Sequence, residues 1–251
     1  MPHADVIGEL AGRVIVITRP AGTAASFARQ VRARGGVPLL LPGLALRASE
    51  DIDAARTQLR AALRDDLLLF TSPASVRFAA ALAPLRTRAT VLAVGQGTVA
   101  ALRRQGLVAQ APTRHQDSEG LLDLPALREI GGRRIALIGA PGGRGLLQQH
   151  LVDAGAWLRE VWVYRRTAPR LDRRHAEAIL HLPASARVLL SSAQALVHLH
   201  DALAPPAWKR LCAATAVVSS ERLAAAAREA GFRRLRLAAS AMPADLLAAA
   251  R

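Results

Sequence analysis

A strand–turn–helix pattern recurs along this chain, and part of it repeats at a fixed spacing. Arg13 precedes the apolar run Val14-Ile15-Val16-Ile17, and Arg133 precedes a similar run 120 positions later. The runs that begin at Leu67 and Arg187 are also 120 positions apart. Continuous apolar runs of this kind are typical of strands buried on both faces of a parallel sheet. Alternating strands and helices also give weak self-similarity by chance, but the shared offset favours two copies of one α/β unit.

The repeat predicts how the chain divides. The second copy, which begins near Arg187, ends before a counterpart of the strand and helix over 133–155. The unit over 13–36, which matches 133–155 at the 120-residue offset, can fill that place. We therefore expect one discontinuous lobe, and the full division is: lobe 1–36 plus 168–251, lobe 48–155, and crossing linkers 37–47 and 156–167. Each lobe should be a parallel sheet with helices on both faces, joined to the other by the two linker strands. A cleft should lie where the carboxyl ends of the strands face each other.

Turn residues place individual elements. Ser72 and Pro73 follow the strand predicted over 67–70, and they are a natural N-cap and first residue of a helix. The pattern also predicts a strand over 107–111 and one continuous helix over 118–130.

Charge and composition exclude several classes of protein. The net charge of +15 favours an anionic partner, but the arginines are spread along the chain and only 3% of residues are aromatic. Nucleic-acid binding therefore rests on charge alone, and we expect no nucleic-acid partner. No apolar run approaches a membrane span and no signal peptide is evident, so we expect a cytoplasmic protein with no membrane partner. The single cysteine, Cys212, lies in an apolar setting typical of an inert thiol.

The usual catalytic clusters are missing. The sole lysine, Lys209, is wrongly placed for a P-loop, and the seven histidines show no metal-ligand spacing, so we expect no metal site. Gly95-x-Gly97-x-x-Ala100 matches the dinucleotide fingerprint, but no acidic residue ends the next strand to bind a ribose. Glycines for a tight turn are the favoured interpretation.

Small hydroxyl side chains, in contrast, recur at or just past the predicted strand ends. A helix N-terminus carries unpaired N–H groups and a partial positive charge, so it binds carboxylates or phosphates without a charged side chain. Each hydroxyl alone could be a simple cap. Together they suggest a site for a ligand with several anionic groups. The residues are Thr18, Thr71, Ser72, Ser75, Thr98, Ser191, Ser192, Ser219, Ser220 and Ser240.

Six stretches follow one another in a specific order and spacing over about 13–250. They are Val16-Ile17-Thr18-Arg19-Pro20, Phe70-Thr71-Ser72-Pro73-Ala74-Ser75-Val76, Ala93-Val94-Gly95-Gln96-Gly97-Thr98, Gly142-Gly143-Arg144, Val163-Tyr164-Arg165-Arg166 and Ser219-Ser220-Glu221-Arg222-Leu223-Ala224. Together they resemble the uroporphyrinogen III synthase family of tetrapyrrole biosynthesis.

The resemblance implies two α/β lobes on a two-stranded linker and a monomeric lyase that uses no cofactor or metal. Its substrate would be hydroxymethylbilane, a linear tetrapyrrole with eight carboxylates, which the family cyclises with inversion of ring D and loss of water. Tyr164 matches the tyrosine that the family places at the cleft, where it would assist departure of the hydroxyl; packing between the lobes is the alternative role. The substrate-binding residues carried over by position are Thr18, Arg19, Thr71, Ser72, Ser75, Gly95, Thr98, Arg144, Ser191, Ser192, Ser219 and Ser220.

The chain departs from the family at two turns. Many bacterial relatives have Arg-Gly before the Gly-Gly-Arg turn, where this chain has Ile138-Gly139-Ala140-Pro141, and some have Gly-Pro in place of Ser219-Ser220. Contacts of the second lobe are therefore less firmly implied than those of the first. The alternative function is a non-catalytic two-lobed protein that binds a polyanionic ligand, such as a degenerate relative kept for sensing.

Overall fold

The structure is a computed structural model, and it describes residues 8–113, 118–142 and 145–251. The chain forms two compact units. The first contains the residues up to Ala45 together with Thr167–Arg251, and the second contains Leu46–Arg166.

The first unit is built on a five-stranded sheet of order β11-β10-β9-β1-β2, in which the neighbouring strands are parallel. Two strands from the start of the chain therefore lie beside three from its end. The strands are β1 (Val14–Ile17), β2 (Val37–Leu40), β9 (Arg187–Leu189), β10 (Thr215–Val218) and β11 (Arg234–Leu237). The helices are α1 (Ala25–Ala33), α7 (Arg173–Leu180), α8 (Ala193–Ala202), α9 (Pro205–Cys212), α10 (Glu221–Glu229) and α11 (Pro243–Ala249).

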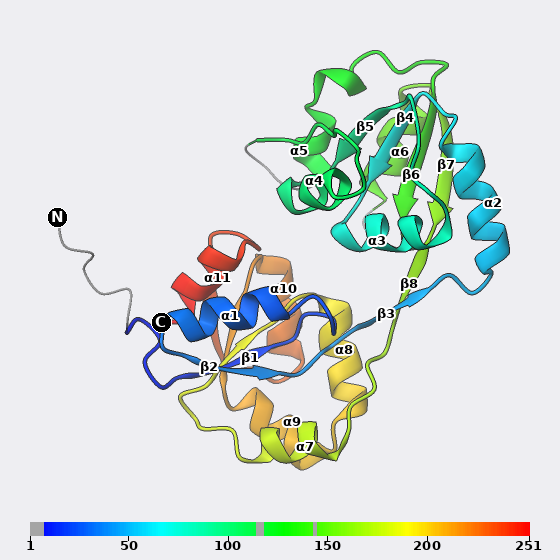
Figure 1. Ribbon diagram of the computed structural model, residues 1–251. Helices are drawn as coiled ribbons and strands as arrows, with labels where there is room; N and C mark the ends of the chain where they lie inside the picture. The colour runs from blue at the N-terminus through cyan, green and yellow to red at the C-terminus, as the bar shows by residue number, and fades with distance from the viewer. Residues whose placement is uncertain (1–7, 114–117, 143–144) are drawn as a thin grey trace. The chain divides into compact units, whose positions relative to one another are not determined.

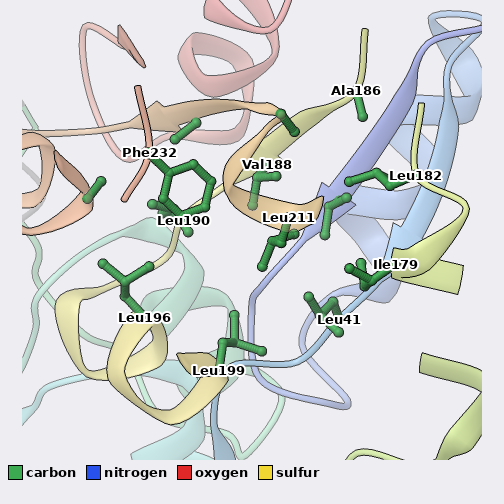
Figure 2. Close-up of a cluster of buried hydrophobic side chains, with 14 of the residues drawn as sticks. Leu41, Ile179, Leu182, Ala186, Val188, Leu190, Leu196, Leu199, Leu211 and Phe232 are labelled. Carbon is green, nitrogen blue, oxygen red and sulfur yellow. The ribbon is translucent and has the colours of Figure 1, made fainter. Parts of the chain in front are cut away.

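Successive side chains of a strand point to opposite faces of the sheet, and each face of this sheet has its own core. Val16 and Val188 pack on the side of α7, α8, α9 and α10, in a cluster that Figure 2 shows around Leu190 and Phe232. Ile17, one position from Val16, packs with residues of α1 and α11 on the other side. The continuous apolar run of β1 is therefore explained by burial on both faces.

The second unit repeats this design with a four-stranded parallel sheet of order β5-β4-β6-β7. Its strands are β4 (Leu67–Phe70), β5 (Thr90–Ala93), β6 (Arg134–Gly139) and β7 (Trp157–Trp162). A separate two-stranded sheet joins β3 (Ala45–Ala48) and β8 (Tyr164–Thr167). The helical segments are α2 (Ile52–Ala62), α3 (Pro73–Leu82), α4 (Gln96–Arg103), α5 (Ser118–Leu122), the 3₁₀ turn η1 (Pro125–Leu127) and α6 (Leu146–Asp153), and their arrangement can be followed in Figure 1.

Helices cover both faces of this sheet as well. Leu68 and Phe70 of β4 pack in one cluster with residues of α2, α3 and α4. Leu67 and Leu69 pack in another cluster with residues of α5, η1 and α6. The predicted fold class, a two-lobed α/β protein with parallel sheets between layers of helices, is confirmed.

The strand orders of the two sheets match the 120-residue repeat. β9 and β10 occupy the places that β4 and β5 occupy in the second unit, and β1 and β2 occupy those of β6 and β7. The edge position that β11 occupies in the first unit has a partial equivalent in the second. There Gln110 forms an isolated parallel bridge with Leu92 of β5.

Three details differ from the sequence predictions. The predicted linkers 37–47 and 156–167 include residues that belong to the main sheets. β2 pairs with β1 and β7 pairs with β6, each as an edge strand. An edge strand is exposed on one side and so has the same mixed pattern as a free crossing segment. The strand over 107–111 is reduced to the bridge at Gln110. The helix over 118–130 is broken into α5 and η1 because Pro125 lacks the N–H that a continuous helix needs.

Candidate functional site

Four helices begin directly after the carboxyl ends of strands, and they begin in the same way. Ser72, Ser192 and Ser220 precede α3, α8 and α10, and each side chain accepts the N–H three residues later. Gly95 precedes α4 without a side chain to do so. The backbone is extended at all four positions, with φ between −162° at Ser220 and −171° at Ser192. These turns therefore present helix N-termini, with their partial positive charge, at the carboxyl edges of both sheets.

The turn into α3 is the most fully hydrogen-bonded of these. Ser72 Oγ accepts the N–H of Ser75 at 3.0 Å, and Ser75 Oγ accepts the N–H of Ser72 at 3.2 Å, which is a reciprocal capping box. Ser75 Oγ also donates to the carbonyl oxygen of Ser72 at 2.7 Å. Pro73 is the first helical residue, where its missing N–H costs nothing. The hydroxyl of the fully buried Ser75 is thus committed to shaping the turn.

Tyr164 reaches this turn from β8. Its hydroxyl oxygen lies 3.3 Å from Ser72 Oγ, and either atom can be the donor. Its ring stacks on Phe78 of α3, with centroids 5.3 Å apart and an angle of 12° between the planes. The residue is 3% exposed and belongs to the core of the second unit. The ring is therefore held rigidly, and the hydroxyl is directed at the N-terminus of α3.

Thr71 lies beside Ser72 and borders a cavity at the same edge of the sheet. Its Oγ1 donates to the carbonyl oxygen of Ile138 at 3.3 Å, and a Cβ at Gly139 would lie only 2.5 Å from that Oγ1. The cavity measures about 190 Å³, and its lining includes Thr71, Trp162 and Arg166. Arg166 donates to the carbonyl oxygen of Pro141 at 3.1 Å. The cavity therefore combines a small hydroxyl with a guanidinium.

In the first unit, Thr18 and Ser191 form a second hydroxyl pair between β1 and β9. Thr18 Oγ1 donates to the carbonyl oxygen of Leu189 at 2.8 Å and lies 3.2 Å from Ser191 Oγ. The N–H of Ser191 donates back to Thr18 Oγ1 at 3.0 Å. Thr18 is fully buried, so its hydroxyl stabilises the turn after β9 from inside the protein. Ser191 is exposed and Ser192 is partly exposed.

Arg19 points back into its own unit. It donates to the carbonyl oxygen of Ala241 at 3.1 Å, and its guanidinium carbon lies 5.2 Å from the centroid of the Phe27 ring. Burial lowers the pKa of Arg19 from its ordinary value, since a charged group is less favourable away from water. Ser240 is similarly engaged, because its hydroxyl donates to Asp245.

The remaining predicted site residues divide between the units. Thr98 is 3% exposed in the first turn of α4, whereas Ser219 is partly exposed directly after β10. The structure thus brings Thr71, Ser72, Ser75 and Tyr164 together in one unit, and Thr18 with Ser191 in the other. Arg144 lies outside the described residues.

The glycine fingerprint over 95–100 fits a turn into a helix. Gly95 has an extended backbone and Gly97 lies inside α4. A Cβ at Gly97 would meet only Pro73 Cγ, at 3.6 Å, which is an ordinary contact. Packing inside the protein therefore does not require glycine at position 97.

Sequence reasoning assigned no role to Phe78 or Arg166. Phe78 supports the ring of Tyr164, and the guanidinium carbon of Arg166 lies 5.9 Å from the centroid of that ring. Arg166 could have been suspected, because a charged residue two positions after the lone tyrosine alternates to the same side of a strand. Phe78 carries no such signal.

The arrangement can bind anions through backbone N–H groups, hydroxyls and Arg166. Within the described ranges no group of three or more His, Cys, Asp or Glu side chains could hold a metal ion. Over the same residues, no helix has both the length and the apolar character needed to cross a bilayer.

Comparison with known proteins gives one consistent result. The family model described as uroporphyrinogen-III synthase HemD matches residues 25–248. The chain is 30% identical over 238 residues to a uroporphyrinogen-III synthase of Salmonella typhimurium, covering 90% of this chain and 95% of the relative. It is 29% identical over 236 residues to the enzyme of the same name from Escherichia coli, with the same coverage.

Solved structures match in fold. The uroporphyrinogen-III synthetase of Helicobacter pylori has a TM-score of 0.61 at 14% identity, covering 94% of this chain and 97% of that one. A mutant uroporphyrinogen III synthase of Thermus thermophilus has a TM-score of 0.57 at 23% identity, covering 89% and 91%. At these identities the two structures support the two-lobed α/β fold.

Proposed function

The chain belongs to the uroporphyrinogen-III synthase family, the cyclising lyases of haem biosynthesis, and we propose that it acts on hydroxymethylbilane in particular. In this reaction the linear tetrapyrrole loses its terminal hydroxyl as water, ring D is inverted, and the macrocycle closes as uroporphyrinogen III. The observation that carries the proposal is the family match over residues 25–248, together with helix N-termini at the carboxyl edges of both sheets.

The chemistry suits a site without an acid–base cluster. Loss of the substrate hydroxyl leaves a stabilised azafulvene cation, and unassisted closure gives the unrotated isomer I. To form isomer III, ring D must attack through its substituted carbon by way of a spiro intermediate. The protein's task is therefore to hold the chain in one folded arrangement and to exclude water, which is catalysis by positioning.

The helix N-termini are suited to the eight carboxylates of the substrate. Each offers unpaired N–H groups and a partial positive charge, which stabilise an anion without adding a positively charged side chain. On this proposal Ser72, Ser192 and Ser220 bind carboxylates beside the N-termini that they cap, and Gly95 gives close access to α4. Thr71, Ser191 and Ser219 lie next to these turns. The buried hydroxyls of Thr18, Ser75 and Thr98 support the same turns from inside.

Arg166 extends the set. It borders the cavity of about 190 Å³ with Thr71, and its guanidinium can form paired hydrogen bonds with a carboxylate. We therefore assign a substrate carboxylate to this cavity. Arg19 and Arg144, which the family resemblance implies as substrate-binding residues, are proposed to bind other carboxylates of the substrate.

Tyr164 is the proposed catalytic residue. Its rigid ring fixes the hydroxyl beside Ser72 at the N-terminus of α3. From there the phenol can donate a hydrogen bond to the departing hydroxyl of the substrate while α3 binds a neighbouring carboxylate. A general acid positioned in this way contributes about 10²-fold or more to a rate.

The proposal includes a monomeric, cytoplasmic enzyme without a metal or cofactor. The size of the protein in solution, measured by sedimentation, tests the monomer.

The test supplies freshly made hydroxymethylbilane and resolves the isomers of the product after oxidation. The proposal predicts isomer III in the presence of the protein and isomer I in the blank. The alternative, a binding protein without catalysis, predicts isomer I alone while hydroxymethylbilane still raises the melting temperature. If the protein neither forms isomer III nor gains melting temperature with hydroxymethylbilane, both the synthase and the binding protein are excluded.

A further inference from the structure

Four arginines gather at the amino edge of the five-stranded sheet, the edge opposite the helix N-termini described above. Arg13 directly precedes β1, Arg187 begins β9, and Arg234 begins β11 with Arg236 two positions further along. Thr215 of β10 pairs in register with both Arg187 and Arg234. Arg187 and Arg234 are therefore two strand spacings apart, about 10 Å.

These four side chains share one face of the sheet. In β1, Ile15 and Ile17 pack on the side of α1 and α11. Arg13 is two positions before Ile15, so its side chain lies on the same face. In β9, Leu189 packs on that side and Arg187 alternates with it. In β11, Leu235 packs on the opposite side, which places Arg234 and Arg236 on the face of α1 and α11. The four residues are called the arginine cluster below.

Backbone carbonyls hold three of the guanidiniums near one another. Arg13 donates to the carbonyl of Ala250 at 3.2 Å, and Arg187 donates to a main-chain carboxylate oxygen of Arg251 at 3.4 Å, just past the end of α11. Arg187 also donates to the carbonyl of Ser185 at 2.9 Å, and Arg234 to the adjacent carbonyl of Ala184 at 3.3 Å. The cluster is thus anchored by adjacent main-chain groups at two places.

These contacts neutralise only part of the charge of the cluster. Among the ion pairs between described residues, none joins a side-chain carboxylate to Arg13, Arg187, Arg234 or Arg236. The nearby Glu9 pairs with Arg251 instead. The main-chain carboxylate of Arg251 supplies one negative charge and the end of α11 about half of one, so most of the four positive charges stay uncompensated.

Burial and the neighbouring positive charges both act on the pKa of Arg187. Burial lowers its pKa from the ordinary value, and the positive charges of Arg13, Arg236 and Arg234 lower that pKa further. Its Nε–H is buried and has no hydrogen-bond partner among the described residues. Four like charges held together in this way are unfavourable unless an anion compensates them.

We propose that the arginine cluster binds a compact, multiply charged phosphate-type oxyanion such as inorganic pyrophosphate or triphosphate. A guanidinium pairs with phosphate oxygens through two parallel hydrogen bonds, so a short phosphate chain can engage several of these arginines at once. The exposed Arg234 and Arg236 provide the approach from solvent. The site is separate from the proposed tetrapyrrole site because it lies at the opposite edge of the sheet.

The experiment measures binding of inorganic tripolyphosphate and orthophosphate to the full chain by calorimetry, with sodium chloride at matched ionic strength as the reference. The expected result is that tripolyphosphate binds and raises the melting temperature, whereas chloride does not. The variant Arg234→Gln/Arg236→Gln should weaken the affinity at least about tenfold, since each removes charge-assisted hydrogen bonds. Arg236→Gln alone is the second variant, because Arg236 is exposed and its loss disturbs none of the carbonyl contacts above.

A matched control separates a local site from the general charge of +15. Arg60→Gln/Arg103→Gln removes two exposed arginines from α2 and α4 in the second unit and changes the net charge equally. Equal weakening in both double variants, or no weakening in Arg234→Gln/Arg236→Gln, would overturn the proposal. Binding of short duplex DNA through the cluster without binding of tripolyphosphate would also overturn it. Formation of isomer III is assayed alongside and should be unchanged in both variants, so failure of the phosphate site leaves the proposed function standing.

Discussion

The hydroxyl oxygen of Tyr164 lies 3.3 Å from Oγ of Ser72, the residue that caps α3. The two residues are 92 positions apart, and the contact joins β8 to the turn after β4. It places the lone phenol of the chain next to a helix N-terminus that is suited to a carboxylate.

Removal of that hydroxyl tests its chemical role. Tyr164→Phe keeps the stack on Phe78 and loses one hydrogen bond, so we expect a loss of stability of about 1 kcal/mol. If the phenol assists departure of the substrate hydroxyl, kcat should fall by about tenfold or more, with a smaller change in KM. Steady-state kinetics checks this, and Phe78→Leu is the control because it loosens the ring and keeps the hydroxyl. Full turnover by Tyr164→Phe would leave Tyr164 with a packing role only.

A negative charge introduced at Ser72, the N-cap of α3, tests whether this helix N-terminus binds a substrate carboxylate or whether Ser72 only caps the helix. Asp, Asn and Ser are comparable N-caps, so Ser72→Asp and Ser72→Asn should both stay within about 0.5 kcal/mol of the parent stability. Only Ser72→Asp places a negative charge where a substrate carboxylate is proposed to bind, and its KM should rise at least about tenfold above that of Ser72→Asn. Equal KM values for the two variants would exclude a carboxylate at this turn. Ser72→Ala should lose about 1 kcal/mol of stability through loss of the cap.

Steric room at Gly139 gives a test of the packing beside Thr71. A Cβ there would lie 2.5 Å from Thr71 Oγ1, so Gly139→Ala should destabilise the protein by about 1–3 kcal/mol. Thr71→Ala removes the clashing atom and should restore part of the loss in the double variant. Gly97→Ala is the matched control: its Cβ meets only an ordinary contact within α4, and it should stabilise by about 0.4–1 kcal/mol. Chemical denaturation measures all three, and additivity of Gly139→Ala and Thr71→Ala would contradict the contact.

The thiol of Cys212 should be unreactive in the folded protein. Burial raises its pKa to about 12, and its Sγ lies 3.5 Å from the carbonyl oxygen of Ala230. At about pH 8 a thiol-specific reagent should label Cys212 slowly, and denaturant should make the labelling fast, because only the thiolate is nucleophilic. The unfolded thiol ionises near its ordinary pKa while the folded one stays protonated. The stability that comes from keeping the folded thiol neutral is therefore unaffected below about pH 9, and the free energy of unfolding falls as the pH rises from there towards 12. Rapid labelling of the native protein would contradict the buried setting.

The fold class followed from the sequence because burial on both faces leaves an unmistakable pattern. The runs at Val14–Ile17 and Leu67–Phe70 have no polar position, and only a sheet covered on both sides explains that. The extent of the crossing segments did not follow. Most residues of β2 and β7 are exposed or half-buried, as those of a crossing segment would be, and only their hydrogen bonds assign these strands to the sheets.

The site was predictable in part. Ser72 was recognisable as a cap from Ser-Pro after a strand, and the structure shows that cap. The burial of Tyr164 and its contact with Ser72 depend on chain segments far apart in sequence, so local patterns could not predict them. The same holds for the arginine cluster, because Arg13 and Arg187 become neighbours only when β1 pairs with β9.

The most direct measurement is the fraction of isomer III formed from hydroxymethylbilane as the concentration of this protein is raised. Unassisted closure competes at a fixed rate and gives isomer I, so the account predicts that the isomer III fraction rises from zero towards completeness. Heat-denatured protein should leave the fraction at zero. A product that remains isomer I at every concentration of folded protein would contradict the account.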